Sequence, residues 1–70
     1  MDASVNLALA MEGGKEALED LAREMVALYG RDAPKMLLQR AEIAEEYGDN
    51  FQARAWREIA AIAARLIGNL

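Results

Sequence analysis

Cysteine, histidine and threonine are absent from this chain of 70 residues, and Ser4 is its only serine. Without cysteine the chain cannot form a disulfide bond. Without cysteine and histidine it also lacks the commonest protein ligands of zinc and iron. A Ser–His–Asp triad is excluded because it requires histidine. We therefore expect a protein that is not an enzyme and that carries no metal ion or cofactor.

The residues that are abundant favour helices. Alanine, leucine, glutamate and arginine are frequent, and they are the residue types that lose least conformational freedom in a helix. Hydrophobic residues make up 54% of the chain, too many for a disordered protein. A chain of this length forms one domain, which hides only about 60% of the surface of its unfolded form. Helix packing and self-association are therefore the expected sources of stability.

The formal net charge is −4, and the charges are unevenly distributed. Residues 1–30 are mainly acidic and residues 51–70 mainly basic, so we expect these regions to face each other within the fold or across a dimer. Net acidity disfavours binding to nucleic acid and to anionic membranes. Asp2 stands where a signal peptide would be positively charged, and no apolar run approaches the ~20 residues of a membrane span. The sequence predicts a cytoplasmic protein without a membrane span.

Apolar residues recur with helical periodicity in three stretches. They fall at the i, i+3, i+4, i+7 spacing of amphipathic helices, which we predict over residues 15–29, 33–47 and 50–67. Because the connections are short, neighbouring helices should run antiparallel or cross steeply. The predicted fold is all-α, a compact three-helix bundle that forms one domain over residues 15–70.

Residues between these stretches are typical of helix ends. Gly30 suits the residue that terminates the first helix. Asp32 is the predicted N-cap of the second helix, with Pro34 in its first turn. Asp49 and Gln52 resemble a capping box at the start of the third helix.

Residues 1–14 are predicted to form a separate N-terminal segment. Val5, Leu7, Leu9 and Met11 alternate with the period of a strand, but a lone strand would have no partner in a helical chain. The same residues also fit the i, i+4 spacing of a helix. We predict a short helix that packs on the bundle or on a partner; the alternative is a tail without regular structure.

The second and third predicted helices carry more apolar residues than one buried face requires. In a monomer the extra residues would form an exposed patch of the kind that soluble proteins generally avoid. Burial in a symmetric dimer or against a larger protein would remove this patch. Trp56 has two interpretations, a core residue or an interface anchor. The candidate interface residues are Met36, Ile43, Trp56, Ile59, Ile62 and Leu66.

Arg40 stands close to an apolar stripe in the middle of the second predicted helix. One interpretation is a buried or interfacial arginine that forms an ion pair with Asp32 or Asp49. The other is an arginine whose aliphatic stem covers the core while its guanidinium stays in water. The sequence leaves both open.

These observations favour a non-catalytic protein–protein interaction module, either a homodimer or a small accessory subunit of a larger complex. The alternative is a small DNA-binding regulator, because two helices joined across residues 29–32 resemble a helix-turn-helix. Its recognition helix would carry Lys35 and Arg40, but three glutamates follow them and no continuous basic stripe exists. Nucleic acid is therefore the less favoured partner.

The stretch from Ala17 to Ile67 resembles a family of short uncharacterised proteins of α-proteobacteria, over about three-quarters of the chain. The resemblance implies a bacterial, cytoplasmic, helical domain, and it implies no particular activity. The residues that carry it are Tyr29, Gly30, Asp32, Ala33, Arg40, Ala41, Gly48, Asp49, Ala53, Trp56, Ile59 and Leu66.

Overall fold

A computed structural model describes residues 14–69 of the chain. In chain order they form helix α2 (Lys15–Tyr29), the 3₁₀ helix η1 (Gly30–Asp32), helix α3 (Ala33–Glu46) and helix α4 (Asn50–Gly68). The fold is all-α and compact, which confirms the predicted class. The α-helices begin and end within one residue of the predicted bounds. The short helix or tail predicted for residues 1–14 lies outside the described residues except at Gly14.

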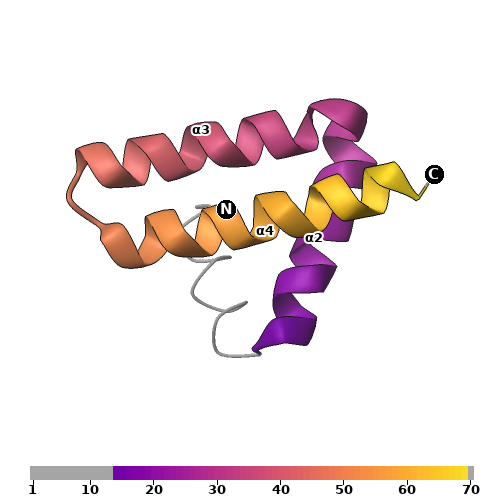
Figure 1. Cartoon of the computed structure of the whole chain (residues 1–70), viewed down its shortest axis with the longest axis horizontal. Helices are drawn as coiled ribbons and strands as arrows, with labels where there is room; N and C mark the ends of the chain where they lie inside the picture. Colours follow the sequence, from indigo (N-terminus) through magenta and orange to yellow (C-terminus); the bar gives the residue numbers. More distant parts are fainter. Residues whose placement is uncertain (1–13, 70) are drawn as a thin grey trace.

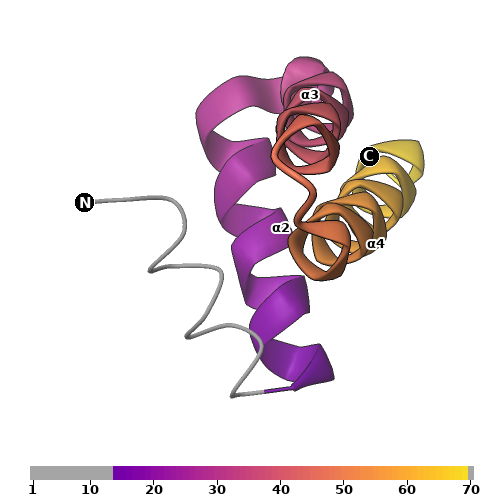
Figure 2. The same cartoon turned by 90° about the vertical axis from the view of Figure 1, so that its left-hand side faces the viewer.

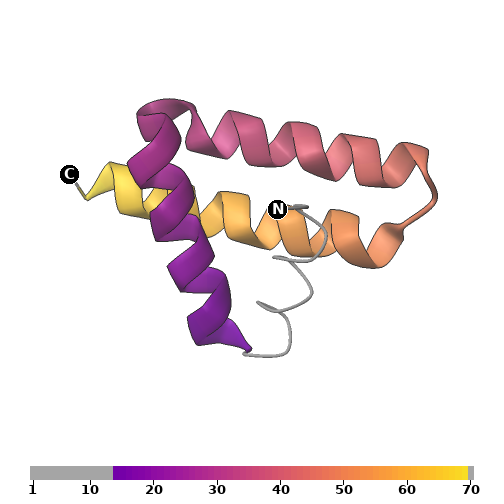
Figure 3. The same cartoon turned by 180° about the vertical axis from the view of Figure 1, so that it is seen from behind.

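Helices α3 and α4 lie side by side and run in opposite directions, joined by a short turn (Figure 1). Helix α2 crosses this α3–α4 hairpin steeply at the end away from that turn (Figures 1 and 3). In Figure 2, α2 lies on one side of the hairpin and approaches both of its helices. The half of the hairpin near its turn therefore has no other described helix packed across it.

Helix α2 passes into α3 without an intervening loop, which distinguishes the fold from a bundle of separate helices. Residues 15–46 form one helical run of 32 residues that bends at η1. Gly30 makes the bend with a φ of 58°, a value that side chains disfavour, and its N–H donates to the carbonyl oxygen of Val26. The chain changes direction at this glycine and continues as helix.

The predicted N-cap at Asp32 is wrong. Asp32 has helical backbone angles, and its side chain accepts no capping hydrogen bond in α3. The 3₁₀ turn removes the need for such a cap, because the N–H of Ala33 already donates to the carbonyl oxygen of Gly30. Pro34 lacks an N–H and so leaves no donor at the next position.

The predicted cap at Asp49 is confirmed. Its carboxylate oxygen Oδ1 accepts a hydrogen bond of 3.0 Å from the backbone N–H of Gln52. Gly48 precedes it with a φ of 77°, so the α3–α4 turn uses a backbone conformation that favours glycine. The N–H of Asp49 donates to the carbonyl oxygen of Ala44, which ties the turn back onto α3.

Alanines form most of the seam between α3 and α4. Small side chains let the two backbones approach closely, and the fully buried Leu37 and Ile59 supply the largest side chains of this core. The buried alanines of the two helices are Ala33, Ala41, Ala44, Ala53, Ala55, Ala60 and Ala63.

Helix α4 needs two apolar faces because it packs against α3 and against α2. Trp56 and Gln52 line a hollow with residues of α3, whereas Ile62 and Leu66 line a smaller one with Glu19 and Arg23 of α2. The expectation of one apolar face per helix fails here for a physical reason: a helix between two neighbours buries two sides. Much of the apparent excess of apolar residues in α4 is thus used within the chain.

No helix of residues 14–69 is long and apolar enough to cross a membrane.

Candidate interaction site

The half of the hairpin near its turn contains a hollow of about 420 Å³ between α3 and α4, which we call the turn-end hollow. Its position follows from the fold: α2 crosses the other half of the hairpin, and the Gly48 turn closes the near end (Figure 1). The lining residues are Arg40, Ile43, Ala44, Tyr47, Asp49, Gln52 and Trp56.

Apolar side chains lie at the edge of the turn-end hollow and remain accessible. Ile43 is 52% exposed and Tyr47 is 84% exposed. They are four residues apart, so they project from the same side of α3. Trp56, in contrast, is buried in the hairpin and also belongs to the lining. The site therefore combines a buried aromatic base with an exposed apolar edge.

Arg40 and Trp56 contact each other across the hairpin. The guanidinium carbon of Arg40 lies 5.3 Å from the centre of the indole ring, within the range of a cation–π interaction. Arg40 is half-buried, so its stem covers apolar surface while the planar head group lies over the ring. The guanidinium thus has an aromatic face as its neighbour, which neither interpretation of Arg40 included.

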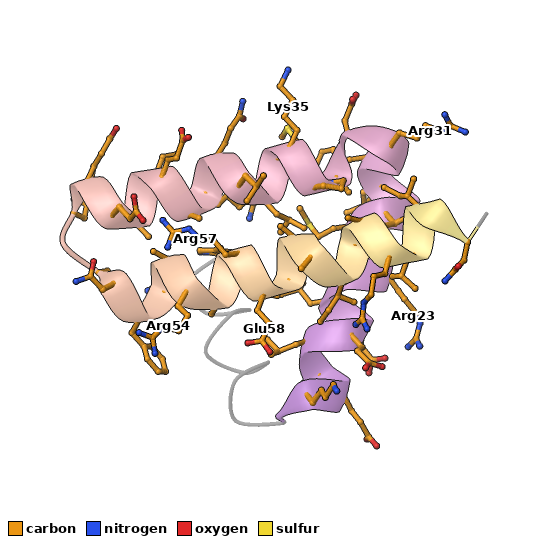
Figure 4. All side chains as sticks on the ribbon, in the orientation of Figure 1. Arg23, Arg31, Lys35, Arg54, Arg57 and Glu58 are labelled. Carbon is orange, nitrogen blue, oxygen red and sulfur yellow. The ribbon has the colours of Figure 1, made fainter. Side chains whose placement is uncertain are left out.

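The ion pairs of residues 14–69 involve Arg23 and Arg57 rather than Arg40. Arg57 of α4 pairs with Glu45 of α3, and both side chains are about half exposed. Figure 4 shows Arg57 between the two helices, on the side that faces the viewer. Because successive helical residues are rotated by about 100°, Ile43 and Glu45 flank Ala44 on opposite sides. Ile43 lines the turn-end hollow, so the hollow lies on the face of the hairpin opposite to this ion pair. Helix α2 crosses the hairpin on the same face as the hollow (Figure 2).

The charges around the turn-end hollow have different roles. The carboxylate of Asp49 caps α4, where it accepts a hydrogen bond from the backbone N–H of Gln52. Arg40 is the cation of the lining, and its head group lies against Trp56. The hollow thus offers apolar side chains together with one half-buried positive charge.

The structure places the predicted interface residues in different environments. Ile43 is exposed at the turn-end hollow, whereas Trp56, Ile59 and Ile62 are buried within the chain. Met36 and Leu66 are half-buried, and Leu66 packs against the core. Of the six residues, only Ile43 and Trp56 line the turn-end hollow.

Four lining residues were not predicted from the sequence as parts of a site: Ala44, Tyr47, Asp49 and Gln52. In the sequence, Asp49 and Gln52 indicate only the start of a helix. The signal that could have indicated Tyr47 is its position beside Gly48, since a large aromatic residue at a tight turn is difficult to bury. Phe51, on the other side of the turn, is likewise 68% exposed.

The expected contact between the acidic and basic parts of the chain is present in part. Arg65 of α4 lines the smaller hollow, of about 170 Å³, together with Glu19 and Arg23 of α2. Arg23 already pairs with Asp20 at 3.1 Å and lies 3.9 Å from Glu19. Within residues 14–69 no cluster of acidic side chains is arranged to hold a metal ion.

No protein-family model, curated protein or solved structure matches the chain. The resemblance to short α-proteobacterial proteins accordingly stays a prediction, and the candidate site rests on its geometry.

Proposed function

We propose that the chain is a non-catalytic protein–protein interaction module, acting as a homodimer or as a small accessory subunit of a larger bacterial complex in the cytoplasm. On this proposal residues 15–70 act as one three-helix domain, and the turn-end hollow is the surface that meets the partner. The supporting observation is the exposure of Ile43 and Tyr47 beside the Arg40–Trp56 contact. Apolar and aromatic side chains around a half-buried arginine are typical of binding hot spots.

The distribution of basic residues favours a protein partner over DNA. Arg57 lies between α3 and α4 and is paired with Glu45, and Arg54 and Glu58 lie on the side of α4 away from α3, so an acidic residue accompanies the basic one there (Figure 4). A phosphate-binding face requires several unneutralised cations in register. The helix-turn-helix resemblance is weakened further because η1 joins α2 and α3 into one continuous helical run.

Sedimentation of the full chain over a dilution series tests the proposal, with two matched variants. Ile43→Asp places a charge at the turn-end hollow, and Leu38→Asp places one at another exposed position of α3, 47% accessible. We expect Ile43→Asp to weaken association by about tenfold or more, as for a hot-spot residue, and Leu38→Asp to leave it unchanged.

The variants also distinguish the two forms of the proposal. A monomeric native chain would overturn the homodimer. The accessory-subunit form then requires a companion protein that co-purifies in fixed stoichiometry with the Leu38→Asp chain and is lost with Ile43→Asp. Equal behaviour of the two variants in both experiments would overturn the proposed function.

A further inference from the structure

We propose that two copies of this chain associate through α3, antiparallel to each other about a two-fold axis beside Ile43, so that Arg40 of each copy stacks on Tyr47 of the other. This inference rests on the homodimer form of the proposed function and specifies which residues meet. In the accessory-subunit form, a different protein would cover the same side of α3.

Arg40, Ile43 and Tyr47 lie along one side of α3. They are separated by three and four residues, the spacing at which helical residues share a side. Tyr47 follows the last residue of α3, but its N–H still donates to the carbonyl oxygen of Ile43, so it continues the helical turn. Ile43 and Tyr47 are exposed, and all three residues line the turn-end hollow. We call this side of α3 the α3 edge.

The guanidinium of Arg40 has a second face that can contact an aromatic ring. Its carbon lies 5.3 Å from the centre of the Trp56 ring, so one face of the planar group lies against the indole. Among residues 14–69 the ion pairs are formed by Arg23 and Arg57, so no described carboxylate pairs with Arg40. Tyr47 of the same chain stands two helical turns away, about 10 Å along α3. A tyrosine ring from a second copy can therefore occupy the other face of the guanidinium.

The α3 edge is complementary to itself. In a two-fold interface, residue i of one copy contacts residue j of the other, and j contacts i. Arg40 and Tyr47 lie on either side of Ile43, so an antiparallel copy of α3 brings each arginine to a tyrosine and the two isoleucines together. Beside them, Gln39 and Glu46 are exposed and also seven residues apart, so the same symmetry pairs an amide with a carboxylate. A different protein would have to supply both a cation and an aromatic ring at this spacing, whereas a second copy supplies both.

A pair of oppositely charged variants tests this arrangement by sedimentation of the full chain. Tyr47→Arg places an arginine against Arg40 at both contacts, and Arg40→Glu combined with Tyr47→Glu places a glutamate against a glutamate. Each variant alone should associate at least about tenfold more weakly than the native chain, because like charges meet twice. Their equimolar mixture should form a heterodimer, since every contact then joins a glutamate to an arginine. A mixture that associates no better than its components would overturn the proposal.

Two further variants control for charge and for folding. Leu38→Arg adds the same charge as Tyr47→Arg at another exposed apolar position of α3, and it should associate as the native chain does. Ile43→Cys keeps the Arg40–Trp56 contact and introduces the only cysteine of the chain. It should oxidise to a disulfide-linked dimer about tenfold faster than Leu38→Cys, because the two-fold axis brings its two sulfurs together. Equal oxidation rates, or equal weakening by Leu38→Arg and Tyr47→Arg, would overturn the arrangement.

The outcomes separate this inference from the proposed function. Native association that Ile43→Asp weakens, but that the mixture of charged variants does not restore, would overturn the antiparallel contact and leave the interaction module in place. A monomeric native chain would overturn the inference together with the homodimer. A companion protein that co-purifies with the Leu38→Asp chain and not with Ile43→Asp would then still support the accessory subunit.

Discussion

The two halves of the α3–α4 hairpin are built from the same alanine seam but have different neighbours. In the half that α2 crosses, Leu18 and Met25 of α2 join the core with buried residues of α4 such as Ile62. In the half near the turn, Ile43 and Tyr47 stay exposed beside the hollow. Similar apolar side chains are thus buried in the half that α2 crosses and exposed in the half near the turn. The position of α2 determines this difference.

The largest effect should come from placing a charge in the covered half. Ile62 is 6% exposed on the α2 side of α4, so Ile62→Asp removes a buried apolar side chain and brings a carboxylate into the core. It should cost about 3–5 kcal/mol of unfolding free energy, enough to unfold a domain of this size. The same substitution at Ile43 should change stability by about 0.5 kcal/mol or less. Urea unfolding followed by circular dichroism measures both. Similar losses for the two isoleucines would mean that the halves do not differ as described.

Overpacking the seam should have the next largest effect. Ala41 is fully buried between the helices of the hairpin, so Ala41→Leu should destabilise the fold by about 1–3 kcal/mol. Ala27→Leu, on the exposed side of α2, is the matched control and should be nearly neutral. Thermal unfolding of the two variants tests this difference. A neutral Ala41→Leu would show that the seam is looser than its alanines indicate.

The two aspartates that precede α3 and α4 offer a smaller comparison. Asp49 caps α4 through Gln52, so Asp49→Ala should cost about 1 kcal/mol. Asp32 accepts no capping hydrogen bond in α3, so Asp32→Ala should lower the unfolding free energy by only about 0.3 kcal/mol. Equilibrium unfolding in urea distinguishes these values. The reverse order would contradict the assignment of the 3₁₀ turn as the start of α3.

The smallest expected effects concern two arginines of the hairpin. Arg40→Gln removes the contact with Trp56 and should cost about 0.5–1 kcal/mol, with little dependence on salt because the stem is half-buried. Arg57→Gln removes an exposed ion pair, and its loss of about 0.5 kcal/mol should disappear at high ionic strength. Unfolding at low and high salt separates the two. Equal salt dependence would argue against a specific Arg40–Trp56 interaction.

Local features of the fold could be predicted from the sequence, whereas relations between helices could not. The bounds of the helices follow from apolar periodicity, and the Asp49 cap and the Gly30 and Gly48 breaks depend on neighbouring residues alone. The absence of a cap at Asp32 depends on a 3₁₀ turn that no single residue type indicates.

The candidate site was predictable only in part for the same reason. Ile43 and Ile62 look alike in the sequence, and one is exposed while the other is buried because α2 covers only one half of the hairpin. The contact of Arg40 with Trp56 joins two helices, so periodicity along either helix says nothing about it. Long-range packing, rather than local propensity, determines these environments.

The most direct test of the account is a backbone amide NMR spectrum recorded while the chain associates, with itself over a dilution series or with a co-purified companion. The account predicts shift changes concentrated in residues 40–56, around the turn-end hollow, with residues 15–29 little affected. Changes concentrated on α2, with residues 40–56 unaffected, would contradict the assignment of the turn-end half of the hairpin as the interaction surface.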